Sequence, residues 1–185
     1  MIEIIPGILD QSFEKALEKV SLVRGLVEWL QIDILDNTLI KNTTYNDFTS
    51  YAPIAKEFNL EAHLMVSDPA KYVGPLVVAG FKRLIAQVEG NDIREFIHQA
   101  RVFEVEVGVA IDSPSDIEMI EPYLGDVDCA LVMMYRMGFS GQTFEPSNLE
   151  KIKRIKSEYP DLPVEVDGGT DSETAPLSIA AGATR

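Results

Sequence analysis

The stretch Glu28–Asp36, EWLQIDILD, predicts a buried strand with one carboxylate inside it and another at its end. Apolar side chains recur at every second position from Leu30. Gln31 and Asp33 alternate with them, so these two polar side chains share one face of the strand. A carboxylate within an apolar strand is costly to bury unless it is paired, bound to a metal or used in chemistry. A solvated edge strand would explain Asp33 without any chemistry, so this stretch alone leaves a functional and a structural interpretation open.

Composition restricts the classes of protein to be considered. The 185 residues, 46% hydrophobic and 25% charged, fit a single globular domain spanning 1–185. A net charge of −14 disfavours binding to nucleic acid or to an anionic membrane surface. Residues Met1–Ile5 lack a basic leader, and no apolar run approaches the ~20 residues of a membrane span. The single Cys129 excludes an intrachain disulfide, which is consistent with a cytoplasmic protein. From the charge and the absence of a long apolar run, we expect neither nucleic acid nor membrane as a partner.

Strand and helix patterns alternate along the whole chain without a linker. The expected strands span residues 2–5, 27–35, 61–66, 83–88, 105–111, 128–134 and 163–166. The expected helices span residues 11–24, 48–58, 68–80, 92–102, 115–124, 146–159 and 172–181. This alternation predicts an α/β fold with a parallel sheet, and uninterrupted units favour a TIM (β/α)8-type barrel over an open doubly wound sheet. No Gly-x-Gly-x-x-Gly turn follows the first strand, which weighs against a dinucleotide fold.

The predicted barrel is truncated, because the chain stops at Arg185 where an eighth strand would begin. The expectation is a single barrel domain, 1–185, that lacks strand eight at its carboxyl terminus. An open barrel leaves two strand edges unpaired, which is an aggregation hazard. We therefore expect that the polypeptide continues past Arg185 or that another chain covers the gap, and a homo-oligomer stays an open alternative.

Three polar residues lie near the carboxyl ends of predicted strands, where barrel enzymes carry their active sites. Asp33, His63 and Asp167 come from distant stretches but would converge there. Aspartate and histidine together can ligate a divalent metal, and aspartate can act as an acid or a base. A single strand histidine is more often a packing residue, and an aspartate before two glycines is often only a turn. Together, the three favour a functional site.

Two glycine-rich loops follow later strands. They contain Gly138, Ser140 and Gly141 in the first loop, and Gly168 and Gly169 in the second. Glycines allow backbone amides to approach a phosphate closely, and in eightfold barrels a phosphate often lies beside the loops of strands seven and eight. A plain turn is the alternative interpretation of each glycine pair.

Several motifs in order resemble one family, the ribulose-phosphate 3-epimerases, along the whole chain. Two segments, HLMV and EVDGG, match the family pattern without change, and the others differ from it at one or more positions. The segments that carry the resemblance are Pro6–Leu9, Gln31–Asp36, His63–Val66, Leu131–Met133, Gly138–Phe144 and Glu165–Gly169.

The resemblance implies an isomerase of the pentose phosphate pathway that interconverts ribulose 5-phosphate and xylulose 5-phosphate. Inversion at carbon 3 requires one group to remove a proton and another to return it on the opposite face. The family uses two aspartates, which correspond to Asp33 and Asp167. It also uses a divalent metal (zinc, manganese or iron), whose ligand positions correspond to Asp33, His63, Asp167 and Gln31. The corresponding substrate-binding residues are Gly7, Met65, Met133, Gly138, Ser140, Gly141, Gly168 and Gly169.

The chain departs from the family pattern at several of these positions. Gln31 replaces a metal-ligating histidine, Gly7 replaces a serine, Gln87 replaces a strand-four histidine, and Tyr135–Arg136 adds bulk and charge. An amide oxygen is a poor zinc ligand beside imidazole, so the metal is expected to bind weakly or to be absent. Two alternatives stay open: a divergent relative that binds a sugar phosphate without catalysis, and a metal-free ketose-phosphate isomerase.

Overall fold

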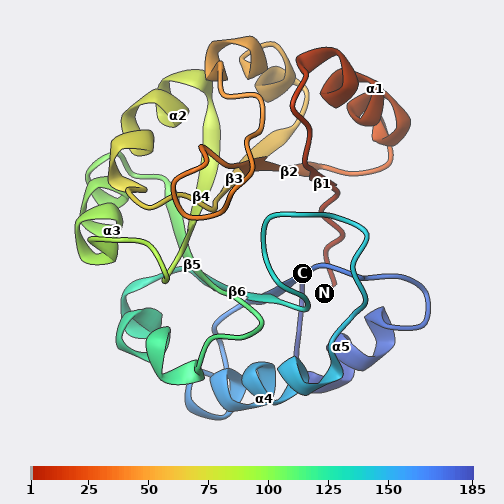
Figure 1. Ribbon diagram of the computed structural model, residues 1–185, viewed down its shortest axis with the longest axis vertical. Helices are drawn as coiled ribbons and strands as arrows, with labels where there is room; N and C mark the ends of the chain where they lie inside the picture. Colours follow the sequence, from red (N-terminus) through yellow and green to blue (C-terminus); the bar gives the residue numbers. More distant parts are fainter. Residues whose placement is uncertain (1) are drawn as a thin grey trace.

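Seven parallel strands form one sheet in chain order in the computed structural model, which describes residues 2–185. Figure 1 shows the sheet curling into a barrel with the helices outside it, and the two chain ends lying together near its centre. The predicted (β/α)8-type architecture is confirmed, with seven strands in the part of the chain described. The strands are β1 (Gly7–Ile8), β2 (Trp29–Ile34), β3 (Asn59–Leu64), β4 (Phe81–Gln87), β5 (Glu106–Ile111), β6 (Cys129–Met133) and β7 (Val164–Asp167).

Five α-helices and several 3₁₀ turns cover the outside of the sheet. The α-helices are α1 (Phe13–Val23), α2 (Val73–Ala79), α3 (Ile93–Val102), α4 (Leu149–Glu158) and α5 (Ala175–Ala181). The 3₁₀ turns are η1 (Phe48–Tyr51), η2 (Ile54–Lys56), η3 (Ala70–Tyr72), η4 (Ile117–Met119), η5 (Glu121–Asp126) and η6 (Pro146–Asn148).

Three predicted elements differ from the structure, two of them because of proline. The helices predicted at 48–58 and 115–124 form only 3₁₀ turns, since Pro53 and Pro122 lack the N–H that a continuing helix needs. The strand predicted at 2–5 is replaced by β1, which begins after Pro6 and pairs Gly7 with Gln31. The amino-terminal segment still runs beside the sheet, because Glu3 N donates to the Thr184 carbonyl oxygen (2.9 Å).

The sheet is buried on both faces, as a parallel sheet requires. On its outer face, Leu30, Ile32 and Ile34 belong to the core beneath the helices. The inner face forms a second apolar cluster inside the barrel. Its buried members are Leu35, Met65, Ile85, Ala110, Cys129, Leu131, Met133 and Met137. Alternation along β2 therefore directs Gln31 and Asp33 inward.

A buried arginine joins three strands inside the barrel. Arg83 of β4 pairs with Glu61 of β3 and with Glu106 of β5, and its guanidinium lies 3.9 Å from the centre of the Trp29 ring. The side chains of Arg83 and Glu61 are almost fully buried, so these two charges compensate one another away from solvent, while Glu106 is partly exposed.

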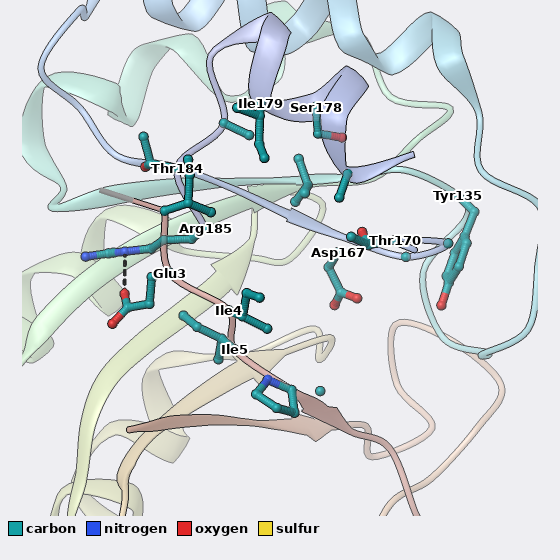
Figure 2. A pocket seen from close by; sticks show the side chains of 18 of the residues that line it. Glu3, Ile4, Ile5, Tyr135, Asp167, Thr170, Ser178, Ile179, Thr184 and Arg185 are labelled. Carbon is teal, nitrogen blue, oxygen red and sulfur yellow. Dashed lines mark ion pairs between the residues drawn. The ribbon is translucent and has the colours of Figure 1, made fainter. Parts of the chain in front are cut away.

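The seam between β1 and β7 is bridged at one end by the last residues of the chain. Arg185 N donates to the Val164 carbonyl oxygen (3.2 Å), and the Arg185 carbonyl oxygen accepts from Val166 N (3.0 Å). The Arg185 guanidinium also pairs with Glu3 (3.2 Å), as Figure 2 shows. Beyond this bridge the seam opens into a cavity that reaches the polar end of the barrel.

Candidate active site

Four polar side chains from β2, β3 and β7 converge at the carboxyl end of the barrel. Gln31 and Asp33 point inward from β2 because strand side chains alternate. Parallel pairing places Asp33 beside His63, and Asp167 ends β7. Gln31, Asp33 and His63 are 3%, 7% and 0% exposed, so their polar atoms need partners inside the site.

These side chains satisfy one another. The Gln31 amide nitrogen donates to Asp33 Oδ1 (2.9 Å) and to Asp167 Oδ2 (2.8 Å). His63 Nδ1 lies 3.3 Å from each of the same two oxygens. One amide and one imidazole therefore hold two carboxylates from opposite ends of the sequence close together.

The electrostatics of the site follow from burial and mutual charge. Burial raises the pKa of Asp33 to about 6, against the opposing effect of His63. Burial would raise the pKa of Asp167 as well, but His63 and Gln31 hold it below its ordinary value. Burial disfavours the charged form of His63, but Asp167 and Asp33 override this and raise its pKa to about 10. Without a metal, His63 therefore carries a proton beside the carboxylates.

The donor set fits a divalent cation with three protein ligands. Asp33, His63 and Asp167 each offer one ligand atom, and these atoms lie within 4.8 Å of one another. One imidazole nitrogen and two carboxylate oxygens suit zinc, manganese or iron and leave a coordination position open. A cation here would take the place of the His63 proton, since ligand imidazoles are neutral. Gln31 contributes an N–H rather than a ligand oxygen in the present arrangement.

A cavity of about 480 Å³ adjoins the two aspartates along the seam. Figure 2 shows Asp167 directed toward the amino-terminal segment that carries Ile4 and Ile5. Four of the predicted substrate-binding residues line this cavity together with Asp33 and Asp167, namely Gly7, Ser140, Gly168 and Gly169. Met65 and Met133 belong to the apolar cluster inside the barrel instead, where they are almost fully buried.

The remaining two glycines lie on the loop after β6. A Cβ on Gly138 would come within 2.5 Å of Ile40, and the Gly138 carbonyl oxygen accepts from the Asn42 side chain (2.7 Å). The loops after β2 and β6 are therefore in contact. A Cβ on Gly141 would meet no atom within 4 Å, so its side-chain direction is open.

Tyr135 packs its ring on Gly168 at the edge of the cavity. The glycine has φ +102°, and a Cβ on it would come within 2.8 Å of the ring. Burial and the charges of Asp167 and Asp33 raise the pKa of Tyr135 to about 12, so its hydroxyl keeps its proton at neutral pH. The bulky side chain of Tyr135 thus lies next to Gly168, the residue that follows Asp167.

The family of the chain is decided by comparison with known proteins. Residues 3–185 match the model of the ribulose-phosphate 3-epimerase family. The chain belongs to this family. The predicted resemblance is therefore confirmed, and the chain is a member of a family of isomerases.

Individual epimerases are similar in sequence to this chain over nearly its whole length. The ribulose-phosphate 3-epimerase of Bacillus subtilis is 32% identical over 192 residues, which cover 99% of this chain and 88% of the relative. The cytoplasmic isoform from Oryza sativa subsp. japonica is 31% identical over 193 residues, which cover 98% of this chain and 82% of the relative.

Solved structures of low sequence identity share the fold of this epimerase-family chain. The 3-keto-L-gulonate-6-phosphate decarboxylase of Vibrio cholerae aligns with a TM-score of 0.73 at 12% identity, covering 96% of this chain and 83% of that structure. The tryptophan synthase of Mycobacterium tuberculosis aligns with a TM-score of 0.68 at 13% identity, covering 99% and 81%. Across residues 2–185, no helix has the length and apolar character needed to span a membrane.

One polar residue near this epimerase-family site was missed by sequence reasoning. Glu89 follows Gln87 by two positions at the end of β4, so strand alternation could have placed both on the same face. Gln87 itself is among the polar residues that the sequence places at the carboxyl ends of the strands, and it departs from the family pattern. In the structure its amide lies 2.9 Å from His63 Nε2 and so reaches the site directly.

Proposed function

We propose that this chain is a ribulose-phosphate 3-epimerase that interconverts ribulose 5-phosphate and xylulose 5-phosphate by proton transfer at carbon 3. The observation that carries the proposal is the pair Asp33 and Asp167, which come from β2 and β7 and line one cavity. Family membership supports the substrate class.

In the proposed mechanism, the two carboxylates act on opposite faces of carbon 3. One removes the proton, and the electrons of the broken C–H bond pass into an enediolate. The other carboxyl group donates a proton to the opposite face, which inverts the configuration. The roles exchange in the reverse direction, so each aspartate serves as the base for one epimer.

Developing negative charge on the enediolate needs stabilisation. Asp33, His63 and Asp167 would hold a divalent metal ion, which when bound supplies positive charge to the enediolate oxygens. The Gln31 amide keeps both carboxylates oriented toward the cavity. Met65 and Met133 present apolar surface behind the site and offer no strong competing hydrogen bonds.

We assign the phosphate group to the glycine loops that line the cavity. Ser140, Gly168 and Gly169 line its wall, and their backbone amides and one hydroxyl are groups that can bind a phosphate. Gly7 lines the same cavity and leaves room for the sugar, whereas Gly138 packs against Ile40 and supports the loop. The positive φ of Gly168 and Gly169 is typical of loops whose backbone approaches a ligand closely.

Incubation of ribulose 5-phosphate with the protein in D₂O, with and without added zinc or manganese, tests this function. The proposal predicts deuterium at carbon 3 and the appearance of xylulose 5-phosphate. Exchange at carbon 1 instead would support the metal-free ketose-phosphate isomerase. Saturable binding of ribulose 5-phosphate without exchange at any carbon would support the non-catalytic sugar-phosphate binder, the alternative that Gln31 favours.

The proposal also covers the setting of the protein. We propose that residues 1–185 form one barrel domain and that the reaction takes place in the cytoplasm. The designation of the Oryza sativa relative as a cytoplasmic isoform supports this location. The partner is a small sugar phosphate.

A further inference from the structure

The two nitrogens of His63 face different partners. Nδ1 points to Asp33 and Asp167, each 3.3 Å away. Nε2 lies 2.9 Å from the side-chain amide of Gln87. Both His63 and Gln87 are fully buried, so water does not serve either side chain. Whether Nε2 donates or accepts therefore depends on which amide atom of Gln87 faces it.

The surroundings of Gln87 decide this orientation. The other end of its amide lies 2.8 Å from Glu89 Oε2 and 3.3 Å from the Ala110 carbonyl oxygen. Both of these atoms are acceptors, so the amide nitrogen belongs on their side and the amide oxygen faces His63. The opposite orientation would place the amide oxygen against a carboxylate. The amide oxygen therefore accepts a hydrogen bond from His63 Nε2–H.

Glu89 is itself held in place by the neighbouring strand. Its Oε1 accepts from Asp112 N (3.0 Å). The Asp112 side chain in turn accepts from Ser113 N (2.8 Å) and from Met137 N (2.7 Å), on the loop after β6. A continuous hydrogen-bonded path thus runs from this loop to the buried face of His63.

We infer that Glu89 is a positioning residue which, through Gln87, fixes a proton on Nε2 of His63 and directs Nδ1 to the metal position. This inference rests on the metal site of the proposed function. Metal-ligating histidines commonly donate their second N–H to a fixed acceptor, which sets the tautomer and the ring orientation. Here Glu89 accepts from the Gln87 amide nitrogen and so fixes the Gln87 amide oxygen as the acceptor for His63 Nε2–H.

The variant E89Q tests the inference with almost no change of shape. Its amide oxygen can still accept from Asp112 N, which directs the new amide nitrogen toward Gln87. Gln87 must then turn its oxygen to that nitrogen and present N–H to His63 Nε2. We expect zinc affinity, measured by calorimetry, to fall by about 10–100-fold. The matched control E104Q changes an exposed glutamate far from this path and should leave zinc affinity unchanged.

A double variant separates positioning from general damage. Q87E/E89Q exchanges the amide and the carboxylate, so an acceptor again faces His63 Nε2. The hydrogen bond between positions 87 and 89 is kept, with its direction reversed. We expect this double variant to recover most of the zinc affinity lost in E89Q. If E89Q unfolds, the comparison of Q87E/E89Q with the parent still applies. Zinc binding by E89Q as tight as that of the parent would overturn the inference.

Nitrogen-15 NMR of the histidine rings reads the proton directly, without metal. The chain has only two histidines, and the exposed His98 serves as the internal reference. Both ring nitrogens of His63 are protonated in the metal-free parent, so the informative readout is the solvent exchange of Nε2–H. This signal should be protected in the parent, where an acceptor faces it, and E89Q should lose that protection. A parent without this signal overturns the inference. A parent that shows it but binds no zinc supports the inference and overturns the metal site of the proposed function.

Discussion

At the scale of single residues, Gln31 controls how closely the two aspartates approach. Two carboxylates near one another repel, and each is buried. A single amide nitrogen that donates to both offsets part of that repulsion. The same nitrogen contacts an oxygen of each aspartate, at the position where a fourth metal ligand would otherwise lie. Gln31 therefore favours a close pair of aspartates over tight metal binding.

The variant Gln31→His should tighten zinc binding by at least roughly tenfold, because imidazole is a better zinc ligand than an amide. The neighbouring Gly7 has no side chain, and even a Cβ there would lie 3.5 Å from the Gln31 nitrogen. A histidine ring at position 31 therefore has room to adjust. Calorimetric titration with zinc provides the measurement, and Gln99→His on the surface of α3 is the control. Unchanged affinity in Gln31→His would show that this position does not reach the metal.

The contact between Gly168 and Tyr135 predicts a second residue-scale effect. Gly168→Ala should lower the free energy of unfolding by about 2–3 kcal/mol, because it strains a positive φ and pushes a Cβ into the Tyr135 ring. Gly141→Ala also has a positive φ but meets open space, so about 1 kcal/mol is expected there. Urea unfolding of both variants measures the difference. Equal losses of unfolding free energy in the two variants would mean that the Tyr135 ring moves aside from the new Cβ without cost.

At the scale of elements, the loop after β2 is tied to the segment that leads into α2. Asp36 accepts from the Tyr72 hydroxyl (2.6 Å) and from Lys71 Nζ (3.3 Å). Thr38 Oγ1 accepts from Ser67 N (2.9 Å) and donates to Asp36. These bonds hold two loops together at the end of the barrel that carries the site.

This tie predicts an acid-dependent stability. Burial alone would raise the pKa of Asp36, but hydrogen bonds from Thr38, Tyr72 and Lys71 hold it below its ordinary value of 3.8. The stabilisation is therefore present above pH 3.8 and is lost as the pH falls through the folded-state pKa. Tyr72→Phe should cost about 1 kcal/mol at pH 7 and less near the folded-state pKa.

Urea unfolding at neutral and acidic pH measures this difference. Tyr159→Phe is the control, because the Tyr159 hydroxyl has no hydrogen-bond partner among residues 2–185. A gap between parent and Tyr72→Phe that widens in acid would contradict the assignment of these bonds to the ionised carboxylate.

Individual residues show what the sequence could and could not predict about these elements. The alternation in β2 predicts which of its side chains face inward, because one face of the strand meets the helices and the other the barrel interior. The rule that barrel sites lie at strand ends brings Asp33, His63 and Asp167 together. The helices predicted at 48–58 and 115–124 are wrong, because the spacing of apolar residues carries no information about the N–H that each proline lacks.

The hydrogen-bonded path to His63 could not be predicted from the sequence. Glu89 acts only through Gln87, and the link depends on the orientation of one buried amide between two strands. Local patterns give the face of each residue, but they do not give the partner of a side chain on a neighbouring strand.

At the scale of the whole molecule, the barrel interior has an ionic part and an apolar part. Arg83 joins β3, β4 and β5 through Glu61 and Glu106, and the methionine-rich cluster fills the space toward the site. Removing one partner from a buried ion pair leaves an uncompensated charge, which is far more costly than losing a surface pair.

Arg83→Met should therefore lower the free energy of unfolding by about 3–5 kcal/mol, mostly because Glu61 loses its counter-charge. Arg94→Met is the matched control, since the Arg94 side chain is 70% exposed and its carboxylate partner is 3.8 Å away. A change within about 0.5 kcal/mol is expected there. Similar losses in the two variants would mean that Glu61 is neutral or otherwise compensated.

The central claim is that Asp33 and Asp167 are a proton-transfer pair acting on opposite faces of one carbon. The most direct measurement is the rate of interconversion of ribulose 5-phosphate and xylulose 5-phosphate in D₂O, followed by NMR, for the parent, Asp33→Asn and Asp167→Asn. The exposed Asp161→Asn is the control. The account predicts a fall of about 10²–10⁴-fold in each of the first two variants and none in the control. Interconversion at the parental rate in either Asp33→Asn or Asp167→Asn would contradict it.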